Sequence, residues 1–252
     1  MAALQLARLG APERDWLDAS AHLSLLAREA AAIGAVLNGR TAEARIGALA
    51  GLIHARFGYR GDRETYDDLD NANLIRVIER RRGLPVALGV IWLHCIHAAG
   101  WEGWGIDFPG HFLVALGGAQ GAGTLIDVFG EGATVGSPDL LALLAGITGH
   151  PTPIEPGMLR PMAVRDVLLR LQRNLVGRRA AAGDRVGALA SLEGMLLMAP
   201  DVAPHWLQAA DLHRVLGQTD DAIACLERFL ALVPSSDASD QARAQIALLR
   251  QG

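Results

Sequence analysis

The feature that most constrains the fold is an internal repeat of 34 residues in the C-terminal third of the chain. An alanine and two leucines in each unit stand four positions apart, which places them on one face of a helix. Each unit is therefore predicted to be a hairpin of two helices that buries its apolar stripe only against a neighbour. The matched pairs are Gly183 and Gly217, Ala188 and Ala222, Leu192 and Leu226, Leu196 and Leu230, and Pro200 and Pro234.

A period of 34 residues is typical of tetratricopeptide repeats. We expect an all-α region over residues 162–252, with repeats at about 169–202 and 203–236 and a capping helix from Ser239 to Gln251. Stacked hairpins of this kind form concave surfaces that bind proteins or peptides. Trp206 falls at helical spacing here and is interpreted either as inter-repeat packing or as a contact for a partner.

Residues 1–150 show helical spacing first and strand-like segments later. Helices are predicted to end at Asn38-Gly39 and at Gly58, followed by a short helix from Asn71 to Arg82 and a markedly apolar one from Pro85 to Ala99. A proline suits the first turn of a helix because its missing N–H has no intrahelical partner there.

Short β-prone segments bounded by glycine follow this apolar helix. They predict two or three antiparallel strands, at Gly103 to Phe108, Phe112 to Leu116 and Thr124 to Phe129, with a hairpin tip at Gly117 to Gly123. Helices first and strands later indicate an α+β domain over residues 1–150. Four prolines then mark a linker near residues 148–161.

Composition and charge exclude several classes of function. The net charge of −4 gives no basic field for nucleic acid, and the apolar run from Leu84 to Ile96 is too short to span a membrane. Neither cysteine, Cys95 or Cys225, has metal-ligand spacing, so no metal and no cofactor are predicted. The N-terminus does not resemble a secretory signal, and we expect a cytoplasmic protein. The oligomeric state stays open.

His111 and Asp127 are the candidate catalytic residues. They stand on the two arms of the predicted hairpin, almost opposite each other, where cross-strand Cβ atoms are about 4.5–5.5 Å apart. A histidine beside a carboxylate is the base and orienting half of a catalytic triad. The alternative is a buried structural hydrogen bond.

Several longer motifs resemble the bacterial SirB-like family, a divergent branch of the transglutaminase-like superfamily whose members often carry C-terminal tetratricopeptide repeats. The resemblance extends from about residue 20 onward and implies a papain-like core. Its motifs are Phe57-Gly58-Tyr59-Arg60-Gly61, Tyr66-Asp67-Asp68 with Asn71 and Asn73, Val77 to Pro85, Gly105 to Val114, and Leu125-Ile126-Asp127.

The resemblance also implies where a nucleophile should stand. In the superfamily a cysteine opens the central helix, and a histidine and an aspartate lie on adjacent strands; His111 and Asp127 match the latter two. The Gly-x-Cys position matches Gly83-Leu84-Pro85, so proline replaces the nucleophile. A slip of two residues would give Val86 or Ala87, neither of which is a nucleophile. Cys95 is no substitute, because eight to ten residues of helix place it about 12–15 Å from the helix start. Val128 also departs from the proline that usually follows the aspartate.

Other polar residues leave two interpretations open. Arg80-Arg81-Arg82 is either an anion-binding block or a solvated helix end that complements the helix dipole. Tyr66 and Asn73 are either turn and capping residues or part of a polar rim around the former active site. Arg82 of the arginine block is a further candidate binding residue.

Three hypotheses of function follow from these residues. The first is a catalytically silent transglutaminase-like protein that binds a protein or peptide partner. The second is an amide-bond hydrolase or acyl transferase that uses His111 and Asp127 with water or another nucleophile. The third is a structural or assembly role without a defined ligand.

Overall fold

The computed structural model describes residues 2–10, 14–117 and 123–251 and consists of two compact units, Met1–Leu171 and Gln172–Gly252. The first unit is helical with a small antiparallel sheet, and the second is entirely helical, so the predicted fold class is confirmed. Most of the predicted hairpin tip, residues 118–122, lies outside the described residues.

Helices dominate the N-terminal part of the first unit: α1 (Ala2–Gly10), α2 (Trp16–Leu37), α3 (Ala42–Ala50) and a π-helical turn, η1 (Gly51–Arg56). Asp15 and Thr41 cap α2 and α3, because each side chain accepts a backbone N–H of the first turn. Helix α2 ends as predicted, with Asn38 as its cap and Gly39 in the left-handed region at φ 78°.

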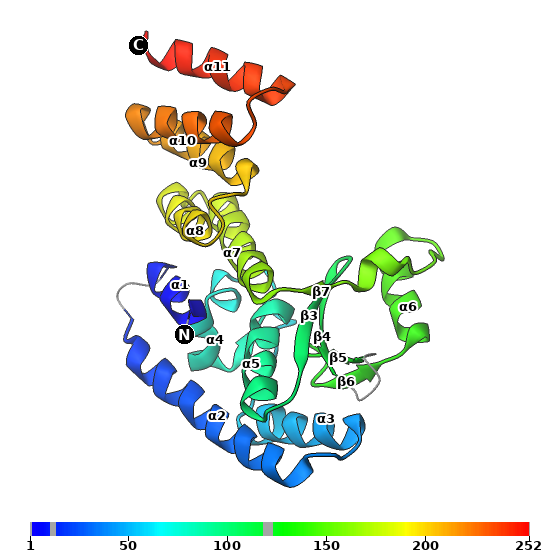
Figure 1. Cartoon of the computed structure of the whole chain (residues 1–252). Coiled ribbons are helices and arrows are strands. Elements are labelled where there is room, and N and C mark those ends of the chain that lie inside the picture. Colours follow the sequence, from blue (N-terminus) through cyan, green and yellow to red (C-terminus); the bar gives the residue numbers. More distant parts are fainter. Residues whose placement is uncertain (1, 11–13, 118–122, 252) are drawn as a thin grey trace. The chain divides into compact units, whose positions relative to one another are not determined.

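Helix α5 (Pro85–Ala98) is the central helix of this unit and is apolar on all sides, as expected of a helix that is covered on all sides. It packs between α2 and strand β4 (His111–Leu116), as Figure 1 shows. Glycines allow these close approaches. A Cβ atom on Gly34 of α2 would overlap the backbone of Ala99, and one on Gly89 of α5 would overlap the ring of Phe112.

The sheet has five antiparallel strands in the order β6-β5-β4-β3-β7. Helix α6 (Ser137–Thr148) covers one face through Leu140 and Leu144, while α5 lies against the other, so β4 is buried from Phe112 to Leu116. The strands are β3 (Gly103–Phe108), β4 (His111–Leu116), β5 (Thr124–Asp127), β6 (Ala133–Val135) and β7 (Pro161–Met162).

Part of the segment predicted as a linker joins this sheet and its core. Met162 pairs with Gly105 of β3, and Ile154 packs on the α6 side of the sheet, beside the short helix η3 (Pro156–Leu159). Pro161 is tolerated because β7 is an edge strand, where one N–H has no ladder partner.

The predicted helix from Asn71 to Arg82 is shorter than expected. A 3₁₀ turn, η2 (Leu69–Asn71), precedes helix α4 (Leu74–Arg80), and β2 (Arg82–Gly83) follows it and pairs in parallel with β1 (Arg60–Gly61). Arg81 separates α4 from β2 in a left-handed conformation, φ 58°, which turns the chain out of the helix.

The second unit contains the predicted helical hairpins. Helix α7 (Val164–Ala181) contributes its C-terminal part, followed by α8 (Arg185–Met198), α9 (Ala203–Val215), α10 (Thr219–Leu232) and the predicted capping helix α11 (Asp237–Leu249). The repeat-matched Gly183 and Gly217 both end a helix in the left-handed region, at φ 77° and 75°. Ala188 and Ala222 are both fully buried. Within the described parts of the chain, no helix is long and apolar enough to cross a membrane.

Candidate functional site

His111 and Asp127 lie in contact on neighbouring strands, which confirms their predicted proximity. His111 opens β4 and Asp127 ends β5, and the register that pairs Val114 with Ile126 makes them diagonal neighbours on one face of the sheet. The Nε2 atom of His111 lies 3.1 Å from Oδ1 of Asp127, and the two side chains are 16% and 24% exposed. The pair has the arrangement of a base and its orienting carboxylate.

The turn after β5 holds the Asp127 carboxylate in place. Its Oδ1 atom also accepts the backbone N–H groups of Phe129 and Gly130, each at 3.0 Å. Burial raises the pKa of Asp127, but the hydrogen bonds from His111, Gly130 and Phe129 outweigh it, so this pKa lies below its ordinary value. An ionised Asp127 accepts the Nε2–H of His111, which leaves Nδ1 of a neutral imidazole as the basic nitrogen.

Arg170 of α7 positions the start of β4. Its Nη2 atom donates to the carbonyl oxygen of His111 at 2.9 Å, and its guanidinium pairs with Asp107 and lies 5.5 Å from the ring centre of Phe112. Sequence reasoning missed Arg170, because a helical pattern does not reveal which distant strand a long side chain will reach.

The start of α5 lies beside the turn that holds Asp127. Gly83 immediately precedes the helix and pairs with Gly61 of β1. The ring of Phe129 packs on Gly61 so closely that a Cβ atom there would come within 2.5 Å of it. The helix start and the Asp127 turn are therefore joined through Gly61 and Phe129.

No nucleophilic side chain stands in the first turn of α5. Pro85 is its first residue, Leu84 is its N-cap, and Val86 and Ala87 follow, all of them buried. Among the described residues, the structure records no hydroxyl or thiol hydrogen-bonded to the His111 imidazole, whose recorded side-chain partner is Asp127.

Both cysteines are buried. Cys95 lies in the last part of α5 with no exposed surface, and burial raises its pKa to about 12. Burial is also the largest cause that raises the pKa of Cys225 in α10, with smaller contributions from Asp221 and Glu193. Neither thiol forms a thiolate readily at neutral pH.

A cleft with a volume of about 450 Å³ adjoins the start of α5 and the Asp127 turn. Arg82 in its wall pairs with Glu64 at 3.1 Å, and the guanidinium of Arg63 lies 5.4 Å from the ring centre of Phe129. We call it the arginine cleft, lined by Arg60, Gly61, Arg63, Glu64, Arg82, Phe129, Gly130 and Glu131. Sequence reasoning singled out only Arg82 of these, although Arg60 and Gly61 lie in a motif that it quoted.

Comparison with known families assigns this core. Residues 18–173 match a family model described as the transglutaminase-like superfamily, which covers more than half of the chain and includes Pro85, His111 and Asp127. The chain belongs to the transglutaminase-like superfamily. Residues 203–246, from α9 into α11, match a tetratricopeptide repeat model. The predicted combination of a transglutaminase-like core and C-terminal repeats is confirmed.

Relatives of this transglutaminase-like chain occur in bacteria and mammals. A UPF0162 protein of Xylella fastidiosa (strain Temecula1) is 30% identical over 198 residues, which cover 77% of this chain and 70% of that protein. A UPF0162 protein of Vibrio cholerae is 34% identical over 158 residues, or 63% of this chain and 57% of the relative. F-box only protein 21 of Mus musculus is 28% identical over 186 residues, or 69% of this chain and 28% of that protein.

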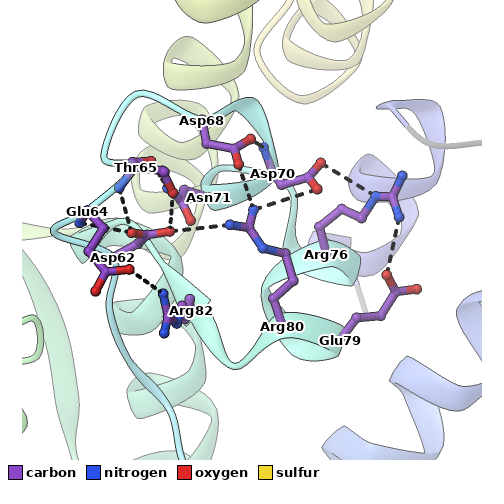
Figure 2. Close-up of polar contacts among 10 residues, drawn as sticks. All are labelled: Asp62, Glu64, Thr65, Asp68, Asp70, Asn71, Arg76, Glu79, Arg80 and Arg82. Carbon is purple, nitrogen blue, oxygen red and sulfur yellow. Dashed lines mark hydrogen bonds and ion pairs between the residues drawn. The ribbon is translucent and has the colours of Figure 1, made fainter.

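A network of charged side chains links residues 62–70 of the transglutaminase-like domain to helix α4 (Figure 2). The Arg80 guanidinium lies 3.3 Å from Asp62, 3.1 Å from Asp68 and 3.6 Å from Asp70. Asp62 is buried and also accepts the backbone N–H and the hydroxyl of Thr65 at 2.9 and 2.7 Å. Burial raises the pKa of Asp62, yet the hydrogen bonds from Thr65 and the other partners outweigh it, so its pKa is lowered.

The three consecutive arginines therefore form neither a shared anion site nor a solvated helix end. Arg80 belongs to the network, whereas Arg81 turns inward and donates from Nη1 to the hydroxyl oxygen of Tyr59 at 2.6 Å, beside His22. Burial and the Arg81 charge lower the pKa of His22 to about 4. Of the three, only Arg82 lines the arginine cleft.

The remaining predicted binding residues lie in different places. Asn73 is buried: Oδ1 caps α4 and Nδ2 donates to the carbonyl oxygen of Ala7 at 2.9 Å, so the capping interpretation is confirmed and Asn73 is not a rim residue. Tyr66 is exposed and packs edge-on against Phe129, with ring centres 5.9 Å apart, which places it beside the cleft.

Trp206 lies in α9 of the second unit. Its Nε1 atom donates to the carbonyl oxygen of Pro200 at 2.9 Å, and Arg228 stacks over the ring at 5.6 Å. It also lines a mainly apolar pocket of about 620 Å³ with Leu197 and Cys225.

No group of three histidine, cysteine or carboxylate side chains that could hold a metal ion is found within the described ranges.

Proposed function

We propose that the transglutaminase-like domain is catalytically silent in cysteine-based acyl transfer and that the chain binds a segment of a protein partner. The observation that carries this proposal is the first turn of α5, where Pro85 stands in the position that matches the nucleophile of the superfamily. The electrostatics of a helix start lower the pKa of a thiol placed there, but proline offers no thiol. Cys95, the single cysteine of this domain, is fully buried in the same helix.

Binding is supported by two surfaces. The arginine cleft lies beside the start of α5 and the turn that holds Asp127, next to the residues that match the triad positions of the superfamily. The helical hairpins of the second unit form the kind of stack that binds peptides elsewhere, and Trp206 lines an apolar pocket in it. We therefore propose Tyr66, Arg82 and Trp206 as binding residues, with His111 and Asp127 as the remnant of a triad.

The test compares partner capture by the wild-type chain with capture by a Cys95→Ala/Cys225→Ala double variant. Both thiols are buried, so a binding protein should lose no capture when they are removed, provided that circular dichroism shows an intact fold. An acyl-transfer assay with a glutamine peptide and an added primary amine runs in parallel. Cysteine-dependent amine incorporation by the wild-type chain would contradict the proposal.

A second candidate function is amide hydrolysis with water as the nucleophile. The observation that favours it is the hydrogen bond between His111 and Asp127, which would hold a histidine ready to take a proton from water. In this case His111→Ala should abolish hydrolysis, whereas the silent protein has no such activity to lose. Hydrolysis that survives His111→Ala would exclude the proposed role of His111.

We propose a SirB-like protein of the cytoplasm, with a transglutaminase-like domain over residues 1–150 and two repeats plus a cap over residues 162–252. Limited proteolysis followed by mass spectrometry tests the boundary. Early cuts between residues 150 and 162 would support it, and protection of that segment, which contains β7, would contradict it.

A further inference from the structure

We infer that the arginine cleft recognises a carboxylate group of the bound peptide, with Arg60 and Arg63 as the residues that hold it. This inference rests on the proposed peptide-binding function and adds the chemical class of the ligand. Its grounds are the pairing state of the cationic side chains in the cleft, the charge balance of the lining and its place beside the former active site.

Two of the three guanidinium groups in the cleft are available to a ligand. Arg82 is paired with Glu64 at 3.1 Å. Arg60 and Arg63 are exposed, and the structure gives neither of them an ion-pair partner among residues 2–10, 14–117 and 123–251. Arg63 instead lies over the ring of Phe129, which fixes the plane of a cation without neutralising it.

The neighbouring arginines show that pairing is common in this part of the chain. The Arg80 guanidinium is surrounded by three carboxylates, and the Arg81 guanidinium is held by Tyr59 and His22. Arg60 and Arg63 therefore differ from these neighbouring arginines, because they line the cleft and the described residues form no ion pair with them.

The charge balance of the cleft fits a single negative charge. Its lining contains three arginines and two glutamates, a net charge of +1, in a chain of net charge −4. Because Arg82 and Glu64 compensate each other, an entering group meets Arg60, Arg63 and Glu131. A carboxylate carries one negative charge and neutralises this lining, whereas a phosphate group carries about −1.5 to −2 and would leave the cleft with an excess of negative charge.

The shape of the partners also suits a carboxylate. A guanidinium presents its N–H groups in a planar fork that binds both oxygens of a carboxylate. The cleft volume of about 450 Å³ falls in the size range of sites for small ligands and short peptide segments. Such a carboxylate is either the C-terminus of a peptide or an aspartate or glutamate side chain, and the experiment below separates these two sources.

The test uses the immobilised full-length chain and a degenerate hexapeptide library, prepared once with free and once with amidated C-termini. Bound peptides are identified by mass spectrometry. We expect the bound pool to be enriched about tenfold in peptides with a carboxylate at one position, and the enrichment to fall in high salt. Enrichment that persists in the amidated library identifies a side-chain carboxylate, and enrichment confined to free C-termini identifies the terminal one.

Matched variants locate the effect. Arg60→Gln/Arg63→Gln should remove the enrichment, whereas Arg28→Gln/Arg40→Gln, two exposed arginines elsewhere in the first unit, should leave it unchanged. Glu131→Gln should strengthen the enrichment, because it removes the opposing charge. Circular dichroism of each variant must match that of the wild-type chain.

Three results would overturn the inference: peptides bound without preference for a carboxylate, the same preference in Arg60→Gln/Arg63→Gln, or no peptide bound from either library. Displacement of bound peptides by inorganic phosphate at far lower concentration than acetate would also overturn it, in favour of a phosphate site. Failure of the proposed function has a different readout, namely cysteine-dependent amine incorporation.

Discussion

Replacement of Arg80 by glutamine should destabilise the transglutaminase-like domain strongly. In the network of Figure 2, Arg80 is the cation nearest to Asp62, whose side chain has no exposed surface. Arg80→Gln keeps much of the volume of the side chain but removes its charge. The buried Asp62 carboxylate would then lack a positive partner.

The magnitude follows from the burial of the pair. Removing one partner of a buried ion pair costs about 3–5 kcal/mol. Here the Arg80 side chain is 29% exposed, and Asp62 keeps its hydrogen bonds from Thr65 at 2.9 and 2.7 Å, so we expect a lower value. A loss of about 2–3 kcal/mol corresponds to a fall in Tm of roughly 4–12 °C for a unit of this size.

The assay is urea and thermal unfolding followed by far-UV circular dichroism, with Arg82→Gln as the matched control. Arg82 stands two residues away, but its partner Glu64 is 80% exposed, and such surface pairs contribute about 0–1 kcal/mol. Equal losses for Arg80→Gln and Arg82→Gln, or a loss below about 1 kcal/mol for Arg80→Gln, would refute the assigned role of the Asp62 pair.

Two further predictions concern the same domain. The pKa of His22 is about 4 in the folded chain instead of 6.5, so between these pH values the unfolded chain binds a proton at His22 that the folded chain does not bind. The free energy of unfolding should therefore fall as the pH falls from 6.5 to 4, and His22→Gln should reduce this pH dependence in urea titrations. An unchanged slope would contradict this origin. Gly61→Ala should cost about 1–3 kcal/mol in thermal unfolding, because its Cβ atom would lie 2.5 Å from the Phe129 ring; a wild-type Tm would show that the ring moves freely.

Features encoded by local pattern could be predicted from the sequence. The repeat of 34 residues located the helical hairpins, since Gly183 and Gly217 must adopt the same left-handed turn and Ala188 and Ala222 occupy the same buried position. The start of α5 followed from a proline that only a first helical turn accommodates.

Features that depend on distant pairing could not be predicted. The segment near Pro161 reads as a linker by composition, and only β3 makes it a strand. Arg80, Arg81 and Arg82 read as one block, but the left-handed backbone of Arg81 sends their side chains to different partners. The arginine cleft joins residues 60–64 to residues 129–131, and no local periodicity connects these segments.

The proposal of a silent enzyme rests on the residue that opens α5, and alkylation of Pro85→Cys tests it most directly. Native protein is treated with iodoacetamide at neutral pH, and adducts are counted by intact mass. The wild-type chain should gain no adduct quickly, because Cys95 and Cys225 are buried. Position 85 is buried too, but it stands at a helix start, which lowers the pKa of a thiol; the Pro85→Cys variant should therefore gain one adduct, with a thiol pKa below about 8.5 that rises when His111 is also changed to alanine.

Opposite results would contradict the proposal at its centre. A rapid adduct on Cys95 of the wild-type chain would show that the transglutaminase-like domain already carries an activated thiol. A cysteine at position 85 that reacts no faster than Cys95, in a variant with a native circular dichroism spectrum, would show that the start of α5 is not the nucleophile position beside His111.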